Sequence, residues 1–213
     1  MPKLKPQELE ARRLEIIAAA RACFLRNGFH QTTTDQICKE ASITPGGLYH
    51  YFRGKDDIIT AVIEHTTQQT VAKLRAAAEE PDDIGSAFRE LAQFLFTTMR
   101  DPDIDNIVRL DMEVWVEGLK NEKLAKISRE SWGIRRQVLE RFIRRSIDEG
   151  LYQPGVVEEK AFAGLLMAIL IGLRVGKLVW KEDFDLNGAM RMLFMMQSGR
   201  LSTTLPPLEV PPK

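Results

Sequence analysis

The sequence contains almost no signal for β-structure. No extended run of β-branched residues alternates with polar ones, and no Asn-Gly or Asp-Gly pair stands between two such runs as the turn of a hairpin. Apolar residues recur instead at helical spacing from end to end of the chain. We therefore expect an all-α protein of about nine helices, with no sheet and no repeats of the solenoid type.

Cysteine, histidine and catalytic motifs are equally scarce. The two cysteines, Cys23 and Cys38, form no CxxC pair, which excludes a disulfide scaffold and suits a reducing compartment. The three histidines lack the spacing or the acidic neighbours of a metal site. No GxSxG, P-loop, HExxH or Rossmann glycine pattern occurs. The sequence therefore indicates no enzyme, no metal and no cofactor.

A long hydrophobic run is also lacking. The first residues, MPKLKPQELEARR, contain no apolar segment of the kind that a secretory signal needs. The longest stretch without a charge, Ala161–Leu173, is shorter than the ~20 apolar residues that span a bilayer. We interpret it as a buried helix and expect a cytoplasmic protein that contacts no membrane.

Neither sign of charge dominates, because 30 Lys and Arg balance 30 Asp and Glu. The distribution is uneven, since residues 1–55 hold nine basic and five acidic side chains. A modestly basic N-terminal quarter is a weak signature of a DNA-binding module. Arginines also gather in residues 122–149, but acidic residues between them predict a solvated, salt-bridged helix face; they are Arg129, Arg135, Arg136, Arg141, Arg144 and Arg145.

The most informative segment lies between about residues 33 and 52. Thr33 followed three residues later by Gln36 is a capping-box pattern, which predicts the start of a helix. Thr44 followed by Pro45 predicts a second start, because threonine caps helices and proline suits their first position. The apolar residues expected to hold the pair together are Ile37, Ala41, Ile43, Leu48 and Phe52. Two short helices joined by a tight turn form a helix-turn-helix.

The second short helix is expected to leave Tyr49, His50 and Tyr51 exposed. Tyrosine and histidine can donate hydrogen bonds to phosphate oxygens or base edges. Gly46 and Gly47, at the start of this helix, would let its backbone approach another surface closely. The alternative is a helical hairpin whose aromatic side chains merely cover a core.

The pattern G-F-x-x-T-T-x-x-x-I-x-x-x-A, followed by T-P-G-G-L-Y-H-Y-F-x-x-K-D-D-I, resembles the N-terminal domain of TetR-type transcriptional regulators from Arg12 to about Ile63. The resemblance implies a three-helix DNA-binding domain, a connecting helix to a larger ligand-binding domain, and a homodimer formed through the last two helices. Matching positions imply DNA contacts at Thr33, Thr34, Thr44, Pro45, Gly46, Gly47, Tyr49, His50, Tyr51 and Lys55.

Two positions depart from the family pattern. Ser42 stands in the turn where glycine is usual, so a positive φ there would cost about 1 kcal/mol. Gly46 and Gly47 stand where bulkier or polar side chains are usual. The second departure shifts the expected base readout toward Thr44, His50 and Tyr51.

The resemblance divides the chain into a DNA-binding domain (1–55) and a ligand-binding and dimerisation domain (56–205), and the prolines of residues 206–213 predict a disordered tail. By the same resemblance, the helices after residue 84 surround an effector site with the candidates Phe88, Phe94, Met99, Met112, Trp115, Trp132 and Arg174. Arg174 interrupts an apolar helix, and a buried arginine needs a partner. It could bind an anionic effector or a carboxylate across a dimer interface, and we favour the interface.

The expected function is that of a dimeric repressor released from a palindromic DNA operator by a small-molecule effector. The faces of 158–180 and 186–201 would form the dimer. The effector would shift the helix that begins near residue 56 and so change the spacing of the two DNA-binding units. The alternative is a dimeric DNA-binding regulator with no small-molecule effector.

Overall fold

The computed structural model describes residues 6–197 of the chain. Its α-helices are α1 (Pro6–Gln31), α2 (Thr34–Glu40), α3 (Pro45–Leu48), α4 (Lys55–Glu79), α5 (Ile84–Met99), α6 (Ile104–Gly118), α7 (Glu122–Asp148), α8 (Glu159–Trp180) and α9 (Leu186–Gln197), with a 3-10 turn, η1 (Lys181–Asp183). No strand occurs between residues 6 and 197, which confirms the all-α prediction. The expected end of the last helix at Leu201 and the tail 206–213 lie outside the described residues.

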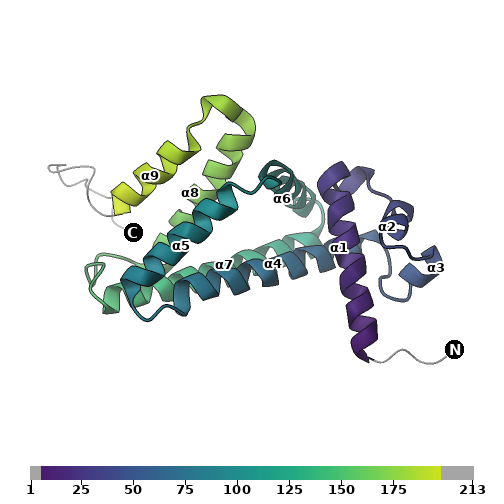
Figure 1. The fold of residues 1–213 in the computed structure, drawn as a ribbon, viewed down its shortest axis with the longest axis horizontal. Helices are drawn as coiled ribbons and strands as arrows, with labels where there is room; N and C mark the ends of the chain where they lie inside the picture. Colours follow the sequence, from purple (N-terminus) through teal and green to yellow (C-terminus); the bar gives the residue numbers. More distant parts are fainter. Residues whose placement is uncertain (1–5, 198–213) are drawn as a thin grey trace.

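The helices are arranged as a small group at one end and a larger bundle at the other (Figure 1). α1, α2 and α3 form the small group, and α4 runs from it along the bundle. α7 packs against α4, α6 and α8, and α5 packs against α4. α6 also packs against α1, so the small group is joined to the bundle through two helices, α4 and α6.

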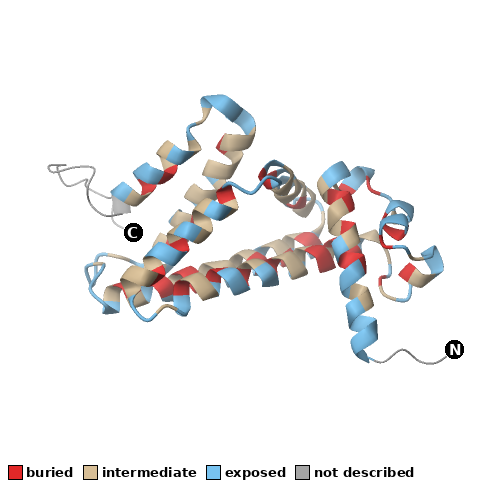
Figure 2. Cartoon of the chain, in the orientation of Figure 1, coloured by how far each residue is buried: buried red, intermediate tan, exposed pale blue. Residues whose placement is uncertain are grey.

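Two clusters of buried side chains form the interior. Figure 2 marks the buried residues along the ribbon in red. The N-terminal core cluster gathers the buried apolar residues between Ile16 and Val62, together with Val114 of α6 and Leu124 of α7. The C-terminal core cluster consists of Val71, Leu74, Ala78, Ala87, Leu91, Val138, Leu139, Phe142, Ile143, Ala163 and Met167. The N-terminal core cluster includes the first two turns of α4, so α4 has its first residues fixed to the small group of helices.

The two cysteines belong to the N-terminal core cluster. Cys23 and Cys38 are both buried, as expected for small apolar side chains. Burial raises the pKa of each thiol, so neither residue carries the thiolate that a redox sensor needs.

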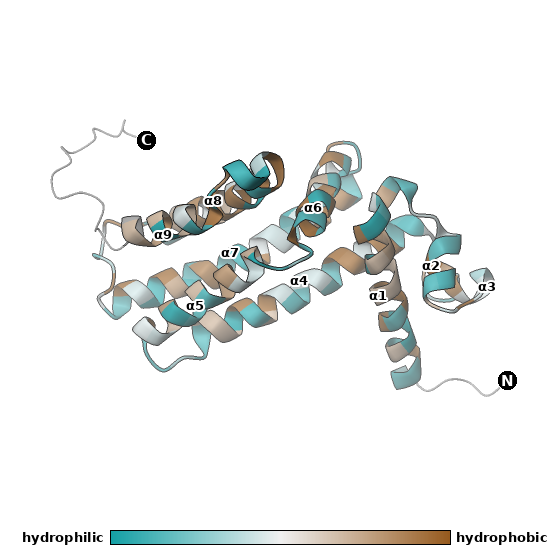
Figure 3. Cartoon of the chain, turned by 45° about the horizontal axis from the view of Figure 1, so that its top comes forward, coloured by the Kyte–Doolittle hydropathy of each residue, from teal (hydrophilic) through white to brown (hydrophobic). Residues whose placement is uncertain are grey.

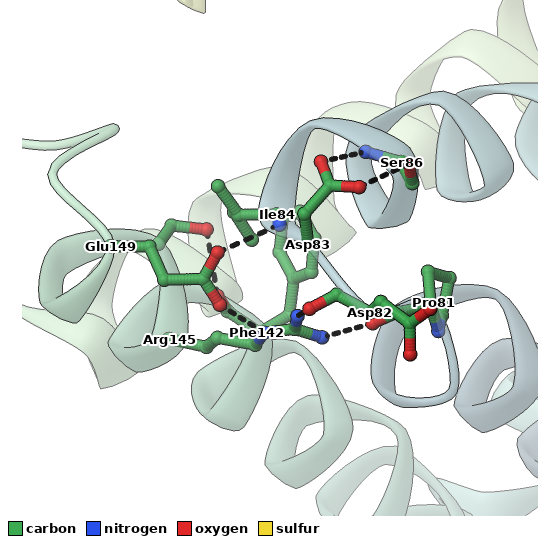
Figure 4. Close-up of polar contacts among 9 residues, drawn as sticks. Pro81, Asp82, Asp83, Ile84, Ser86, Phe142, Arg145 and Glu149 are labelled. Atoms are coloured by element: carbon green, nitrogen blue, oxygen red, sulfur yellow. Dashed lines mark hydrogen bonds and ion pairs between the residues drawn. The ribbon is translucent and has the colours of Figure 1, made fainter.

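The connection between α4 and α5 is held by one arginine of α7 (Figure 4). Arg145 donates hydrogen bonds from Nη1 to the carbonyl of Pro81 at 2.8 Å and from Nη2 to the carbonyl of Asp82 at 2.9 Å. Its Nε donates to Glu149, whose other oxygen accepts from the backbone N–H of Ile84 at 2.8 Å. The salt bridge expected of Arg145 is present, but the side chain is not solvated as expected, because it and Glu149 together bind three backbone groups of the connection.

The helix α8 is strongly apolar and is more exposed in this single chain than expected. The segment Glu159–Asp183 is long and apolar enough to cross a membrane by length and composition, and it is mostly unburied. Figure 3 shows its hydrophobic residues along much of α8. The exposed positions of α8 recur at the helical repeat and form one stripe, the α8 stripe, consisting of Ala161, Leu165, Ala168, Gly172 and Val179. The interpretation of Ala161–Leu173 as a buried helix is wrong for a single chain, because only Ala163 and Met167 are buried in this stretch.

Candidate nucleic-acid interface and interior charge cluster

The start of α2 has the predicted capping box. Thr33 is the N-cap, in extended conformation, and its Oγ1 accepts from the backbone N–H of Gln36 at 3.2 Å. The side-chain oxygen of Gln36 accepts in return from the backbone N–H of Thr33 at 2.9 Å. Two otherwise unpaired donors of the helix end are thus satisfied locally, which fixes where α2 begins.

The turn between α2 and α3 contains a strained serine. Ser42 has a φ of 49°, in the left-handed region that favours glycine. The turn is also bound from outside, because Nη2 of Arg12 in α1 donates to the carbonyls of Ala41 at 3.2 Å and Ser42 at 3.0 Å. Arg12 is a positioning residue that the sequence did not reveal, since nothing in its spacing relates it to a turn 30 residues away.

α3 begins as predicted but is very short. Thr44 is the N-cap, with Oγ1 accepting from the backbone N–H of Gly47 at 3.1 Å, and Pro45 occupies the first turn. The helix ends at Leu48, and the chain continues as hydrogen-bonded turns to Phe52. Leu48 and Phe52 are both buried, so the predicted apolar pair is present although one continuous helix does not join it.

Most of the residues expected to contact DNA form one exposed surface on α3 and the starts of its neighbours. Thr33, Thr44, Pro45, Gly46, Tyr49 and His50 are exposed, and Thr34 and Gly47 are half-buried. Tyr49 has 58% of its surface exposed although it is aromatic. A Cβ on Gly47 would lie 2.8 Å from Ile43, whereas one on Gly46 would meet nothing. Gly47 therefore serves packing within the turn, and only Gly46 leaves room for an outside surface.

Two of the residues expected to contact DNA, Tyr51 and Lys55, are half-buried and contact other parts of the protein. Tyr51 is half-buried and packs against the N-terminal core cluster, because the chain leaves the helix after Leu48. The expectation that Tyr51 is fully exposed is therefore wrong. Lys55 is half-buried, and its Nζ donates to the carbonyl of His30 at the end of α1, at 3.3 Å. Its ammonium is engaged by the protein in this state.

The aromatic and methionine residues proposed to line an effector site lie in three different places. Phe88, Phe94 and Trp132 are half-buried and pack against the C-terminal core cluster. Met99 is fully buried and borders a hollow of about 730 Å³, which lies between the end of α5 and the turn from α8 to α9. Met112 and Trp115 on α6 are 37% and 38% exposed, so they lie on the outside of this chain.

Arg174 lies in the interior rather than on the exposed face of α8. It follows Ala163 and Met167 at helical spacing, both buried, and this face is opposite the α8 stripe. Its Nε is buried and has no hydrogen-bond partner among residues 6–197. The charges near it are Asp111 of α6 and Arg135 of α7, so the prediction of a solvated Arg135 is also wrong.

α6 contacts the small N-terminal group of helices directly. The backbone N–H of Phe29, at the end of α1, donates to Oε2 of Glu113 at 2.6 Å. A hollow of about 310 Å³ lies beside this contact, between α1 and α6. A second link joins α7 to α4, where Nζ of Lys123 lies 2.7 Å from Oδ1 of Asp57. α6 is therefore joined to α1, and α7 to α4, by polar contacts.

The comparisons with known proteins agree with this arrangement. Residues 16–62 match the model of the family described as bacterial regulatory proteins, tetR family. The chain is 28% identical over 156 residues to the HTH-type transcriptional regulator YfiR of Bacillus subtilis, covering 72% of this chain and 74% of YfiR. It is 28% identical over 142 residues to the HTH-type transcriptional repressor NicS of Pseudomonas putida, covering 64% and 66%.

A solved structure with the same fold is that of a TetR transcription regulator from Haloarcula marismortui. The TM-score is 0.77 at 19% identity, and the match covers 89% of this chain and 98% of the other. The matched N-terminal residues are those that form α1, α2, α3 and the first turns of α4. Residues 16–62 therefore match the tetR family of bacterial regulatory proteins, and the chain is similar over most of its length to HTH-type transcriptional regulators and shares the fold of a solved TetR regulator.

Proposed function

We propose that the chain is a cytoplasmic, homodimeric repressor that a small-molecule effector releases from a palindromic DNA operator. In this proposal residues 1–55 bind DNA, and residues 56–205 bind the effector and form the dimer. The observation that carries the proposal is the exposed α3 surface, where Tyr49 and His50 project from a turn that is fixed by two capped helices. The relative NicS is named as a repressor, which supports repression over activation.

The α3 surface suits a DNA groove in shape and chemistry. Thr44, Tyr49 and His50 offer donors and acceptors for phosphate and base edges, and Gly46 leaves space for close approach. In the dimer, two such surfaces would enter successive major grooves, ~34–36 Å apart. Tyr51 and Lys55 would contribute less, because both already contact the protein.

The α8 stripe supports a homodimer. Leu165 is 55% exposed in the centre of the stripe, and the small residues Ala161, Ala168 and Gly172 flank it. Small residues on both sides of a leucine let a second helix approach closely. Burying this stripe and the exposed Met192 of α9 against a second copy would remove an apolar surface that a soluble monomer rarely exposes.

Release by an effector would act through α6 and α4 together. An effector among the bundle helices that moves α6 would pull on the bond between Glu113 and Phe29, and a change in α7 would act on α4 through Lys123 and Asp57. Both routes end in the helices that carry the DNA-binding surface. A coupling free energy of about 1–3 kcal/mol is typical of such linked sites.

The DNA proposal is tested by selecting bound sequences from random duplex DNA, with and without a metabolite extract. We expect a palindromic consensus whose binding falls when extract is added. Tyr49→Ala should weaken binding uniformly across sequences if the phenol contacts phosphate, whereas loss at particular bases assigns it to base readout. Selection without enrichment would contradict DNA binding, and enrichment that no extract reduces would favour the effector-free regulator.

The dimer proposal is tested by sedimentation of purified protein. Leu165→Glu places a charge in the centre of the α8 stripe and should convert a dimer into monomers. Leu151→Glu is the matched control, because Leu151 is also exposed but lies in the α7–α8 connection. A wild-type monomer that binds operator at full affinity would contradict the proposal, as would recovery of the protein in the membrane fraction.

A further inference from the structure

Three half-buried charged side chains from three helices influence one another electrostatically. They are Asp111 of α6, Arg135 of α7 and Arg174 of α8, hereafter the interior charge cluster. The surroundings lower the pKa of both guanidiniums by desolvation, and Asp111 is the group that opposes this effect. Desolvation raises the pKa of Asp111 in turn, against the attraction of both arginines.

The hydrogen bonds of this cluster are incomplete. Nη2 of Arg135 donates to the neutral hydroxyl of Thr67 on α4 at 3.2 Å, and that hydroxyl donates to Ser131 at 3.0 Å. Nε of Arg174 is buried without a partner in residues 6–197. Within residues 6–197, no ion pair joins Asp111 to Arg135 or to Arg174. Both arginines thus have N–H donors that make no hydrogen bond to the described part of the protein.

The charge of the cluster is also unbalanced. Two guanidiniums face one carboxylate, and arginine does not relieve the excess by losing a proton. An unpaired charge in the interior is costly, which is why buried charges are normally paired. The α8 stripe cannot supply the missing anion from a second copy, because Arg174 lies on the opposite face of the helix. A second copy packed on the stripe would therefore leave this charge unpaired.

We propose that Arg135 and Arg174 bind the carboxylate of a small organic monoanion, and that this molecule is the effector. One negative charge balances the one excess positive charge, and a planar carboxylate matches the donor geometry of guanidinium. The neighbouring C-terminal core cluster, on the same α7 and α8, offers an apolar environment for the remainder of the molecule. The proposal rests on the proposed effector-released function and adds the chemical class of the effector.

One connection from the cluster to the N-terminal helices runs along α6. Asp111 and Glu113 are two residues apart on α6, and Glu113 accepts from Phe29 at the end of α1. A bound carboxylate competes with Asp111 for both arginines. Loss of that attraction releases α6 from α7 and α8, and the bond to Phe29 transmits the movement to α1.

The test uses the full chain, with benzoate and octanoate as probes and benzyl alcohol and octanol as neutral counterparts, in titration calorimetry and thermal unfolding. We expect at least one carboxylate to bind and to raise the melting temperature, and neither alcohol to do so. Arg174→Met should weaken that binding about tenfold or more, as loss of a charged hydrogen bond does. Asp111→Asn should tighten it, because it removes the competing carboxylate.

The matched control is Arg129→Met, on the exposed face of α7 beside Glu122, which should bind as wild type does. The proposal is overturned if neither carboxylate binds, if the alcohols bind equally, if Arg174→Met binds as wild type does, or if Asp111→Asn weakens binding. DNA binding is measured separately on the selected operator. Operator binding without carboxylate binding refutes only the effector class, and carboxylate binding that leaves the operator complex intact refutes only effector release.

Discussion

Oε2 of Glu113 accepts a hydrogen bond from the backbone N–H of Phe29 at 2.6 Å, although the two residues are 84 positions apart in the chain. Gly28, just before Phe29, has φ 75° and ψ 172°, a conformation that is essentially restricted to glycine. A Cβ on Gly28 would lie 2.3 Å from Oε1 of Glu113. The break in α1 thus creates both the donor and the space that this carboxylate needs.

Substitution of Gly28 by alanine should therefore act in two ways. The backbone conformation alone should cost about 1–3 kcal/mol of the free energy of unfolding. Displacement of Glu113 should cost about 1 kcal/mol more through the lost hydrogen bond. In a Glu113→Ala background only the backbone cost remains. Urea denaturation of both single variants and the double variant should therefore show a double variant that is less destabilised than the sum of the two single variants. Additive effects would show that the glycine and the carboxylate act independently.

Ser42 offers a prediction of opposite sign. Its φ of 49° costs about 1–2 kcal/mol in a residue with a side chain. Ser42→Gly removes this strain. It also makes the unfolded chain more flexible, which lowers the free energy of unfolding by about 0.4–1 kcal/mol. We expect a net gain of about 0.5 kcal/mol in thermal or urea unfolding, with unchanged DNA affinity. Ser42→Ala, which keeps the strain, is the control, and a less stable glycine variant would contradict the account.

The positions of the short helices could be predicted because their signals are local. Thr33 with Gln36, and Thr44 with Pro45, place caps and first turns through contacts within three residues. Ser42 was recognised as a strained position for the same reason. Each of these features depends on the backbone within one turn, so tertiary packing does not override it.

The interior charges could not be predicted because their surroundings come from distant helices. The neighbours of Arg135 three and four positions away are Ser131, Trp132, Val138 and Leu139 rather than acidic residues, which places it on an apolar face of α7, but only the packing of α7 against α6 brings Asp111 to it. Tyr51 was assigned to the surface on the assumption that α3 continues, whereas the helix ends at Leu48. Helix length and helix rotation are set by packing, and spacing alone does not fix them.

The link between α7 and α4 gives a pH dependence. The hydrogen bond from Lys123 to Asp57 holds the pKa of that carboxyl below its usual range, with a smaller contribution from the backbone N–H of Arg53. Because the folded pKa is lowered, this contribution is fully present above the unfolded value of about 4 and is lost as the pH falls through the folded value.

Lys123→Met should therefore destabilise the protein at pH 7 and lose its effect in acid. The size at pH 7 should be modest, because Asp57 is about a third exposed and solvent screens the pair. Urea midpoints at pH 7 and at about pH 3 measure the difference between variant and wild type. Lys126→Met, which removes an exposed pair with Glu130, is the control. A difference that stays constant with pH would show that Lys123 acts by packing alone.

The connection of α4 to α5 provides the last prediction (Figure 4). Arg145 is three-quarters buried in its side chain and donates to two backbone carbonyls of the connection, at Pro81 and Asp82. Arg145→Met keeps the aliphatic stem but leaves both carbonyls without this donor, so we expect a loss of about 2 kcal/mol in urea unfolding. Arg144→Met is the matched control, because Arg144 is adjacent, exposed and paired with Glu159, and should cost under about 0.5 kcal/mol.

Since the connection lies far from α3, operator affinity measured well below the melting temperature should be unchanged in both variants. Equal stability of the two variants would contradict a structural role for Arg145, and a loss of operator affinity would place the α4–α5 connection in the path that controls DNA binding.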